Sequence, residues 1–287
     1  MGKMTKSRKQ LSTLQAIIGI LFSIVILVIA QLLAFSISEI PLRLGIPSSL
    51  CNIIAGILYV ALTLFGVNIL SNKVLKVSLL ELRIPKFSLK GIWVIAAVLM
   101  PMIVLILSMI TGGHWKINLF GTETTLEIIT SAIVFYGLAA GVVEEVVFRG
   151  VIMGCLERRF HIWIAVIIPS ILFGVVHIIG NELDFLSVIQ LLIAGSIVGI
   201  LFSLVAYESN SIWNNAMIHA VWNMVIIGGI LHIGSEADGN SILNFVLKNK
   251  SFLISGGDFG IEASVISILA YLIFIILAIV LLKKKEN

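Results

Sequence analysis

Long runs of apolar residues, separated by short polar segments, recur along the whole chain. Each run has at least roughly the 20 residues that a helix needs to cross about 30 Å of hydrocarbon. The pattern predicts eight membrane-spanning helices, at residues 12–34, 49–71, 91–112, 125–157, 161–180, 186–206, 211–232 and 263–282. We therefore expect an all-α fold, a polytopic integral membrane protein of about eight transmembrane helices.

The composition supports the same fold class. Hydrophobic residues make up 59% of the 287 residues and charged residues only 12%, and the mean hydropathy is +1.14. Soluble domains carry about 25% charged residues, so a soluble fold is excluded. We divide the chain into residues 1–124 with three helices and a linker, 125–232 with helices four to seven, and 233–287 with a polar segment and the last helix.

Lysine and arginine residues are distributed unevenly between the two sides of the predicted bundle. With the N-terminus inside, fourteen fall in cytoplasmic segments and four in external loops, while Arg149 lies within a helix. The positive-inside rule predicts this asymmetry. We expect a multi-pass protein of the cell membrane with both termini and the linker 72–90 in the cytoplasm and the segment 233–262 outside. The net charge of +4 thus indicates topology, and we expect membrane lipid and no nucleic acid as a partner.

Ionisable and polar side chains inside the predicted helices are few and concentrated in three of them. They are Glu144, Glu145 and Arg149 in the fourth helix, His177 in the fifth, and His219 and Asn223 in the seventh. Such residues are costly in a membrane, and by default they indicate function. Glu145 and Arg149 are four residues apart with the acid first, which favours an ion pair within the helix. Glu144 lies about 100° further around the helix and has no cation at that spacing.

The helical rise brings these groups to similar depths. Measured from the predicted cytoplasmic helix ends, Glu144 and Asn223 lie about 20 Å deep, His177 about 24 Å and His219 about 14 Å. His219 and Asn223 share one helix face, since they are four residues apart. Any one buried histidine could be no more than an interhelical hydrogen-bonding residue. Six such groups at common depth instead indicate one shared polar cavity.

This set of residues has the chemistry that peptide hydrolysis needs. A carboxylate in apolar surroundings can act as a general base, so Glu144 with His177 could hold and deprotonate a water. His219 and Asn223 could donate hydrogen bonds to the tetrahedral oxyanion. A second mechanism uses Glu144, His177 and His219 as the ligands of a catalytic zinc with an open position for water. The residues alone leave both mechanisms open.

Three motifs in this region resemble those of the CAAX protease and bacteriocin-processing family, also called Abi or type II CAAX prenyl endopeptidases. The segments are Glu144-Glu145-Val-Val-Phe-Arg149, similar to the family's EExxxR, Phe173-Gly-Val-Val-His177, similar to FxxxH, and His219-Ala-Val-Trp-Asn223, similar to HxxxN. They stand in the family's order on separate predicted helices, and together they cover about residues 125–225.

The resemblance implies an eight-helix intramembrane endopeptidase. The implied roles are Glu144 as catalytic base acting with His177, His219 and Asn223 as the oxyanion site, and Glu145 and Arg149 as supporting residues. Family descriptions differ on a metal, so zinc and a metalloprotease activity stay open. Relatives process CAAX-box proteins or are linked to bacteriocin maturation and self-immunity, and the Lys-, Ile- and Asn-rich chain suggests a bacterial member. The substrate implied is a membrane-associated peptide or a lipidated protein.

Two other classes of protein are compatible with the residues. A proton-coupled transporter also places Glu and His at mid-membrane, but interrupted helices in corresponding positions of two halves would be expected, and the sequence shows none. A non-proteolytic membrane scaffold or bacteriocin-immunity protein could keep the motifs for folding, and only an activity measurement separates it from a protease.

Overall fold

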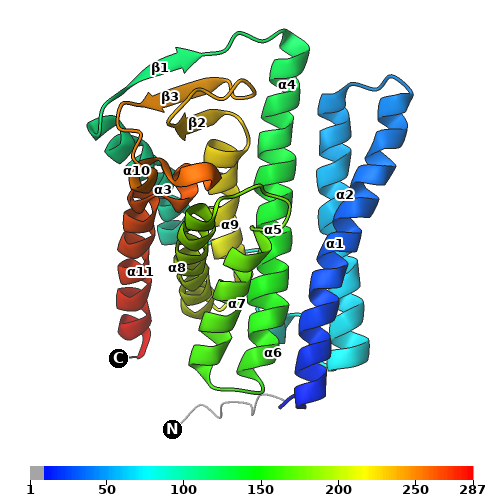
Figure 1. Cartoon of the computed structure of the whole chain (residues 1–287). Coiled ribbons are helices and arrows are strands. Elements are labelled where there is room, and N and C mark those ends of the chain that lie inside the picture. Colours follow the sequence, from blue (N-terminus) through cyan, green and yellow to red (C-terminus); the bar gives the residue numbers. More distant parts are fainter. Residues whose placement is uncertain (1–9, 287) are drawn as a thin grey trace.

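A bundle of long helices, with a small sheet at one end, makes up the computed structural model of residues 10–286 (Figure 1). The fold is 74% helical. Six helices of the described part are long and apolar enough to cross a membrane, and two shorter ones occupy the predicted fifth and seventh positions. These observations confirm the all-α, polytopic membrane fold. Four basic residues of the predicted charge pattern, Lys3, Lys6, Arg8 and Lys9, lie outside the described residues.

The helical segments follow the predicted spans in order. They are α1 (Thr13–Arg43), α2 (Ser48–Ile69) continued by η1 (Leu70–Leu75), α3 (Gly91–Ile110), a long fourth helix over 122–157, α7 (Ile162–Val176), α8 (Phe185–Ser209), α9 (Ile212–Trp222) continued by η5 (Asn223–Ile227), and α11 (Val265–Glu286). Large apolar side chains such as Leu21 of α1, Ile95 of α3 and Ile276 of α11 remain exposed. These faces suit contact with lipid.

The fourth helix is the longest, at 36 residues. Its sections are α4 (Thr122–Thr130), η3 (Ser131–Ala139), α5 (Ala140–Glu145), η4 (Val146–Ile152) and α6 (Met153–Glu157). The sections η3 and η4 are π-helical, a wider turn that is often found at functional sites. One π-helical section begins directly after Glu145, and η5 begins at Asn223 in the same way. The helical geometry therefore changes at two of the three motifs.

Two predicted spans extend too far. The fifth was predicted to reach residue 180, but α7 ends at Val176, and the seventh was predicted to reach 232, but η5 ends at Ile227. The apolar runs continue past both ends, so hydropathy did not reveal the turns. Gly180 and Gly229 have φ of 85° and 81°, a left-handed conformation that favours glycine. These glycines turn the chain out of each helix.

A three-stranded sheet, which the sequence analysis did not predict, joins two distant segments. Its strands are β1 (Gly113–Ile117), β2 (Leu231–Gly234) and β3 (Leu243–Leu247), in the order β1-β3-β2. β3 pairs antiparallel with β1 and parallel with β2, so that Phe245 lies opposite both Trp115 and Ile233. Three short helical turns follow, α10 (Phe252–Ser255), η6 (Gly257–Phe259) and η7 (Ile261–Ala263). They lead the chain from the sheet back to α11.

The opposite end of the bundle is held together by ion pairs. α1 begins and α11 ends at this end, away from the sheet (Figure 1). The linker between α2 and α3, which includes η2 (Leu80–Leu82), is joined to the fourth helix by the Arg83–Glu157 pair. Lys90 pairs with Glu208 of α8 at 2.6 Å, and Lys285 of α11 donates to the Glu208 carbonyl at 2.9 Å. The polar linker is therefore an ordered part of the fold.

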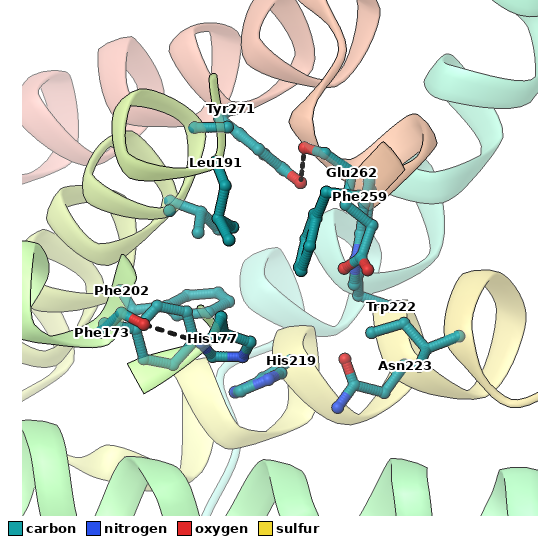
Figure 2. Close-up of a pocket in the computed structure, with 14 residues that line it drawn as sticks. Phe173, His177, Leu191, Phe202, His219, Trp222, Asn223, Phe259, Glu262 and Tyr271 are labelled. Atoms are coloured by element: carbon teal, nitrogen blue, oxygen red, sulfur yellow. Dashed lines mark hydrogen bonds between the residues drawn. The ribbon is translucent and has the colours of Figure 1, made fainter. Parts of the chain in front are cut away.

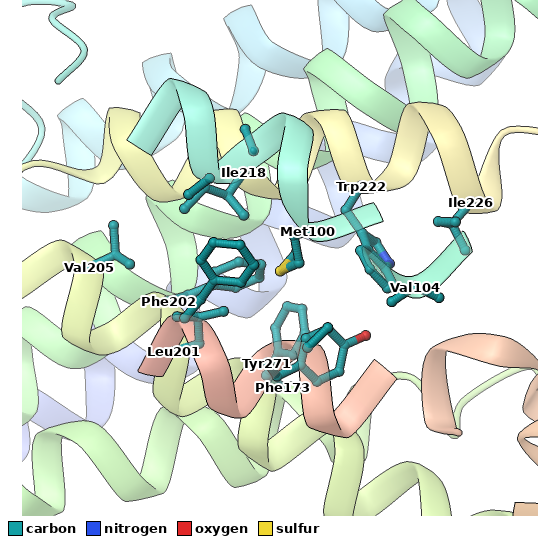
Figure 3. Packing of buried hydrophobic residues seen from close by; sticks show 14 of the residues in the cluster. Met100, Val104, Phe173, Leu201, Phe202, Val205, Ile218, Trp222, Ile226 and Tyr271 are labelled. Carbon is teal, nitrogen blue, oxygen red and sulfur yellow. The ribbon is translucent and has the colours of Figure 1, made fainter. Parts of the chain in front are cut away.

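The main apolar core lies between α3, the fourth helix, α7, α8, α9 and α11. Met100, Phe202, Ile218, Trp222 and Tyr271 are among its buried members (Figure 3). Phe202, Trp222 and Tyr271 also line a cavity beside the motif histidines. These three side chains therefore belong to the apolar core and also border the cavity that the motif histidines line.

Candidate active site

Glu145 lies at the centre of a buried polar network. Its Oε1 accepts hydrogen bonds from Arg149 Nη1 at 2.7 Å and from His219 Nδ1 at 3.1 Å. Its Oε2 accepts a hydrogen bond from the side-chain amide of Asn215. All four side chains are buried. The ion pair expected within the fourth helix is thus formed, and the same carboxylate holds α9 against that helix.

Arg149 is surrounded by aromatic rings as well as by its carboxylate. Its guanidinium carbon lies 4.6 Å from the ring centroid of Phe173 and 5.0 Å from that of Phe202. Such cation–π contacts are strongest where water is excluded. Nη2 donates to the carbonyl oxygen of Gly199 at 3.2 Å. A Cβ at Gly199 would lie 2.7 Å from Ser170 Cα, so the absent side chain lets α8 approach α7 at this position.

His219 faces Glu144 with its second ring nitrogen. Because Nδ1 donates to Glu145, the lone pair of the neutral ring is on Nε2. Nε2 lies 3.8 Å from Glu144 Oε2, beyond direct hydrogen-bond distance. That oxygen has no hydrogen-bond partner among the described residues. The Glu144 side chain is 20% exposed, whereas that of Glu145 is fully buried. Of the two neighbouring carboxylates, only Glu144 is accessible.

His177 is the C-cap of α7 and directly follows its last residue, Val176. Its Nδ1 donates to the Phe173 carbonyl oxygen at 2.6 Å, so Nε2 is again the free nitrogen. The Phe173 ring packs against both histidines, at centroid distances of 4.6 Å from His177 and 5.7 Å from His219. Phe173 therefore contacts both histidines. Its carbonyl oxygen orients the His177 ring, and its own ring packs against His219.

Asn223 lies one turn after His219 and contacts the fourth helix. Its Nδ2 donates to the Tyr136 carbonyl oxygen at 2.9 Å. Its Oδ1 is buried and has no hydrogen-bond partner in the described part of the chain. Since the amide has two hydrogens, one N–H also stays uncommitted. Asn223 therefore offers both a donor and an acceptor.

The larger of two cavities at this site has a volume of about 530 Å³. It lies between α1, α2, the fourth helix and the end of α7, and most of its lining is apolar. Its polar lining includes Gln31, Tyr59, Glu144 and His177. The free carboxylate of the first motif therefore faces a space large enough for part of a substrate.

The smaller cavity has a volume of about 60 Å³ and lies between α7, α8, α9, η7 and α11 (Figure 2). Its polar lining includes His177, His219, Asn223 and Glu262. His177 lines both cavities. The predicted catalytic residues therefore lie around two adjoining spaces. Glu144 and His177 form no direct hydrogen bond or ion pair among the described contacts and instead line the larger cavity together.

Sequence reasoning missed two polar residues of this site. Asn215 was not among the predicted site residues, although the four-residue spacing to His219 and Asn223 places all three on one face. Glu262 lies in η7, just after the sheet. Nothing in its local sequence indicates that the chain returns to the motif helices there.

The zinc alternative was tested against the geometry. Both histidines present Nε2 while Nδ1 donates to an oxygen, as metal-binding histidines do. Nevertheless, within residues 10–286 no three His, Cys, Asp or Glu side chains are arranged to hold a metal ion. Glu144, His177 and His219, as placed, therefore do not fit a three-ligand metal site. That zinc takes part in the reaction stays a prediction, which chelation experiments can test.

The bundle of apolar helices places carboxylate and imidazole groups beside cavities in its interior. This combination defines a polytopic membrane protein with an enzyme-like site. Residues 126–225 match the family model described as Type II CAAX prenyl endopeptidase Rce1-like. The matched segment contains all three motifs, and it confirms the resemblance to this protease family. The match supports a CAAX protease-like enzyme in a membrane. A comparison with curated proteins finds none that matches the chain.

Proposed function

We propose that the protein is an intramembrane endopeptidase that cleaves membrane-associated peptides, including lipidated or bacteriocin-type peptides. One observation carries the proposal: the two adjacent glutamates have different surroundings. Glu145 binds Arg149, His219 and Asn215, whereas Glu144 keeps a free oxygen and borders the larger cavity. A carboxylate of the second kind is available to act as a general base.

In the proposed reaction, Glu144 accepts a proton from a water held between it and His177. The resulting hydroxide attacks the carbonyl carbon of the scissile peptide bond and forms a tetrahedral oxyanion. The C–N bond then breaks as Glu144 returns the proton to the leaving nitrogen, giving a carboxylic acid and an amine. The reaction adds one water across the C–N bond and needs no other reactant.

The oxyanion in this proposal is stabilised from α9. His219 carries an N–H on Nε2 only when its ring is doubly protonated, and Glu145 Oε1 at 3.1 Å supplies the compensating negative charge. Asn223 adds its uncommitted N–H. Donors fixed before the reaction, in a site from which water is largely excluded, are especially effective.

The larger cavity supports an apolar substrate. Its volume of about 530 Å³ is within the usual range for ligand sites. Ile24, Leu27 and Val28 of α1 contribute to its lining, and the outer face of α1 is apolar. We propose that a hydrophobic side chain or lipid group of the substrate binds against these residues.

The proposal is tested with purified protein and candidate membrane peptides, with and without their lipid. Wild type should cleave at least one of them, and a folded Glu144→Gln variant should cleave none. Glu182→Gln makes the same chemical change at an exposed position after α7 and should leave the rate unchanged. A chelator should abolish turnover, and added zinc restore it, only if a metal takes part. Wild-type turnover by Glu144→Gln would overturn the proposal.

A further inference from the structure

The smaller cavity is bordered by a carboxylate that the proposed reaction does not use. Glu262 belongs to the η7 turn that follows the sheet, and it lines this cavity together with His177, His219 and Asn223. Figure 2 shows its carboxylate across the cavity from the two histidines. The chain between β3 and α11 thus contributes a polar group to the motif site.

Glu262 is held firmly in this position. Its Oε1 accepts a hydrogen bond from Trp222 Nε1 at 3.0 Å. Its backbone carbonyl accepts one from the Tyr271 hydroxyl at 3.2 Å, and Ser267 Oγ donates to the preceding Ile261 carbonyl at 2.6 Å. The second carboxylate oxygen, Oε2, has no hydrogen-bond partner among the described contacts. One oxygen therefore orients the carboxylate and leaves the other available to the cavity.

The cavity has the size and the polar groups that water requires. A buried water occupies about 10–15 Å³ of such volume and needs two to four polar partners. A cavity of about 60 Å³ therefore has room for roughly four to six waters. Asn223, which is 5% exposed, directs its unpartnered Oδ1 into this space (Figure 2). Burial raises the pKa of the Glu262 carboxyl above its ordinary value, which favours a form that can donate as well as accept.

We propose that the smaller cavity supplies the hydrolytic water, and that Glu262 is the positioning residue that holds this water there before it moves past His177 to the position between His177 and Glu144, where it reacts. The inference rests on the proposed protease activity. A substrate that fills the larger cavity excludes water from that side. Glu144 lines only the larger cavity, so water from the smaller cavity has to pass His177 to reach it. His177 lines both cavities, so water can reach the reacting carbonyl past its free Nε2. Substrate and water then arrive from opposite sides.

The first test compares two substitutions of Glu262. Glu262→Ala removes the water-holding group, so kcat should fall about tenfold, the effect of one lost hydrogen bond. KM should stay within about twofold, since the substrate cavity is untouched. Glu262→Gln can still accept from Trp222 and bind water, and it should keep kcat within about threefold of wild type. Equal kcat for wild type and Glu262→Ala would overturn the inference.

The second test blocks the space itself, which keeps the inference testable if Glu262→Ala does not fold. Ala194 lines the smaller cavity and Ala140 the larger one. Ala194→Val should lower kcat with little change in KM, whereas Ala140→Val should raise KM. The reverse pattern would contradict separate spaces for water and substrate.

Failure of this inference is distinguishable from failure of the protease proposal. In the Glu144→Gln background, adding Glu262→Ala should leave the dissociation constant for a bound substrate peptide unchanged. If Glu144→Gln is inactive while Glu262→Ala and Ala194→Val turn over normally, only the water cavity is disproved. If Glu144→Gln is fully active, the protease mechanism itself is disproved.

Discussion

Positions 144 and 145 carry the same residue type in different surroundings, and substitution should separate them. Glu145→Ala leaves the buried Arg149 without its carboxylate and removes the acceptor for His219 and Asn215. Removing one partner of a buried ion pair costs about 3–5 kcal/mol, so this variant should express poorly or unfold at markedly lower temperature. Glu144→Ala removes a partly exposed group and should stay close to wild type in thermal unfolding. Equal stability of the two variants would contradict this distinction.

The four residues proposed to react should behave as one unit. Single alanine substitutions of Glu144, His177 or His219 should reduce turnover nearly as much as the triple substitution, because groups that act together are strongly non-additive. Asn223→Ala should cost less, on the order of 10²–10³ in kcat, as for one oxyanion donor. The measurement is kcat for the single, double and triple variants of equal purity. Effects that multiply independently would argue against a common site.

At the scale of single residues, the sequence predicted what helical spacing determines. The i,i+4 rule identified the Glu145–Arg149 pair, because the partners lie on one helix. Contacts between helices were not predictable in the same way. Neither the bond from Asn215 to Glu145 nor the return of Glu262 to the motif helices follows from local spacing. Both depend on how distant segments pack.

At the scale of elements, the site depends on the close approach of α5 and α9. A Cβ at Gly141 would lie 2.8 Å from the backbone nitrogen of Ala220, and backbone atoms cannot move aside independently. Gly141→Ala should therefore separate Glu144 and Glu145 from His219, with overpacking costing about 1–3 kcal/mol and a loss of turnover. Thermal unfolding and kcat are the measurements. Gly121→Ala, where a Cβ meets nothing within 4 Å, is the matched control and should match wild type.

Prediction of the elements succeeded where length and apolar composition determine structure. All six long apolar helices were predicted, since lipid requires such runs. The ends of α7 and η5 were missed because Ile178 and Ile230 continue the apolar runs beyond the last helical residues, Val176 and Ile227. The sheet was missed because the paired residues of β1 and β3 lie far apart in the sequence, from 126 positions for Ile117 with Leu243 to 134 for Gly113 with Leu247. Short strands that pair at such long range leave no local periodicity.

In the whole molecule, more basic residues lie at the end of the bundle opposite the sheet than at the end that carries the sheet. Those of the linker 72–90, Arg158, Arg159 and the lysines at 283–285 lie at the end opposite the sheet, whereas Lys116, Lys248 and Lys250 belong to the sheet and its flanks (Figure 1). With the positive-inside rule, this distribution predicts that the sheet and the turns that carry Glu262 face the outside. The small cavity would then lie nearer to the external water.

Cysteine labelling in cells tests this orientation. In a background without Cys51 and Cys155, which are both buried, Asn249→Cys beyond β3 and Ser88→Cys in the linker place one exposed thiol at each end. A membrane-impermeant maleimide should label Asn249→Cys in intact cells. It should label Ser88→Cys only after the membrane is permeabilised, because the linker is predicted to be cytoplasmic. The reverse result would invert the orientation, and labelling of both positions from outside would require an even number of spans between them, instead of the five that the structure places there.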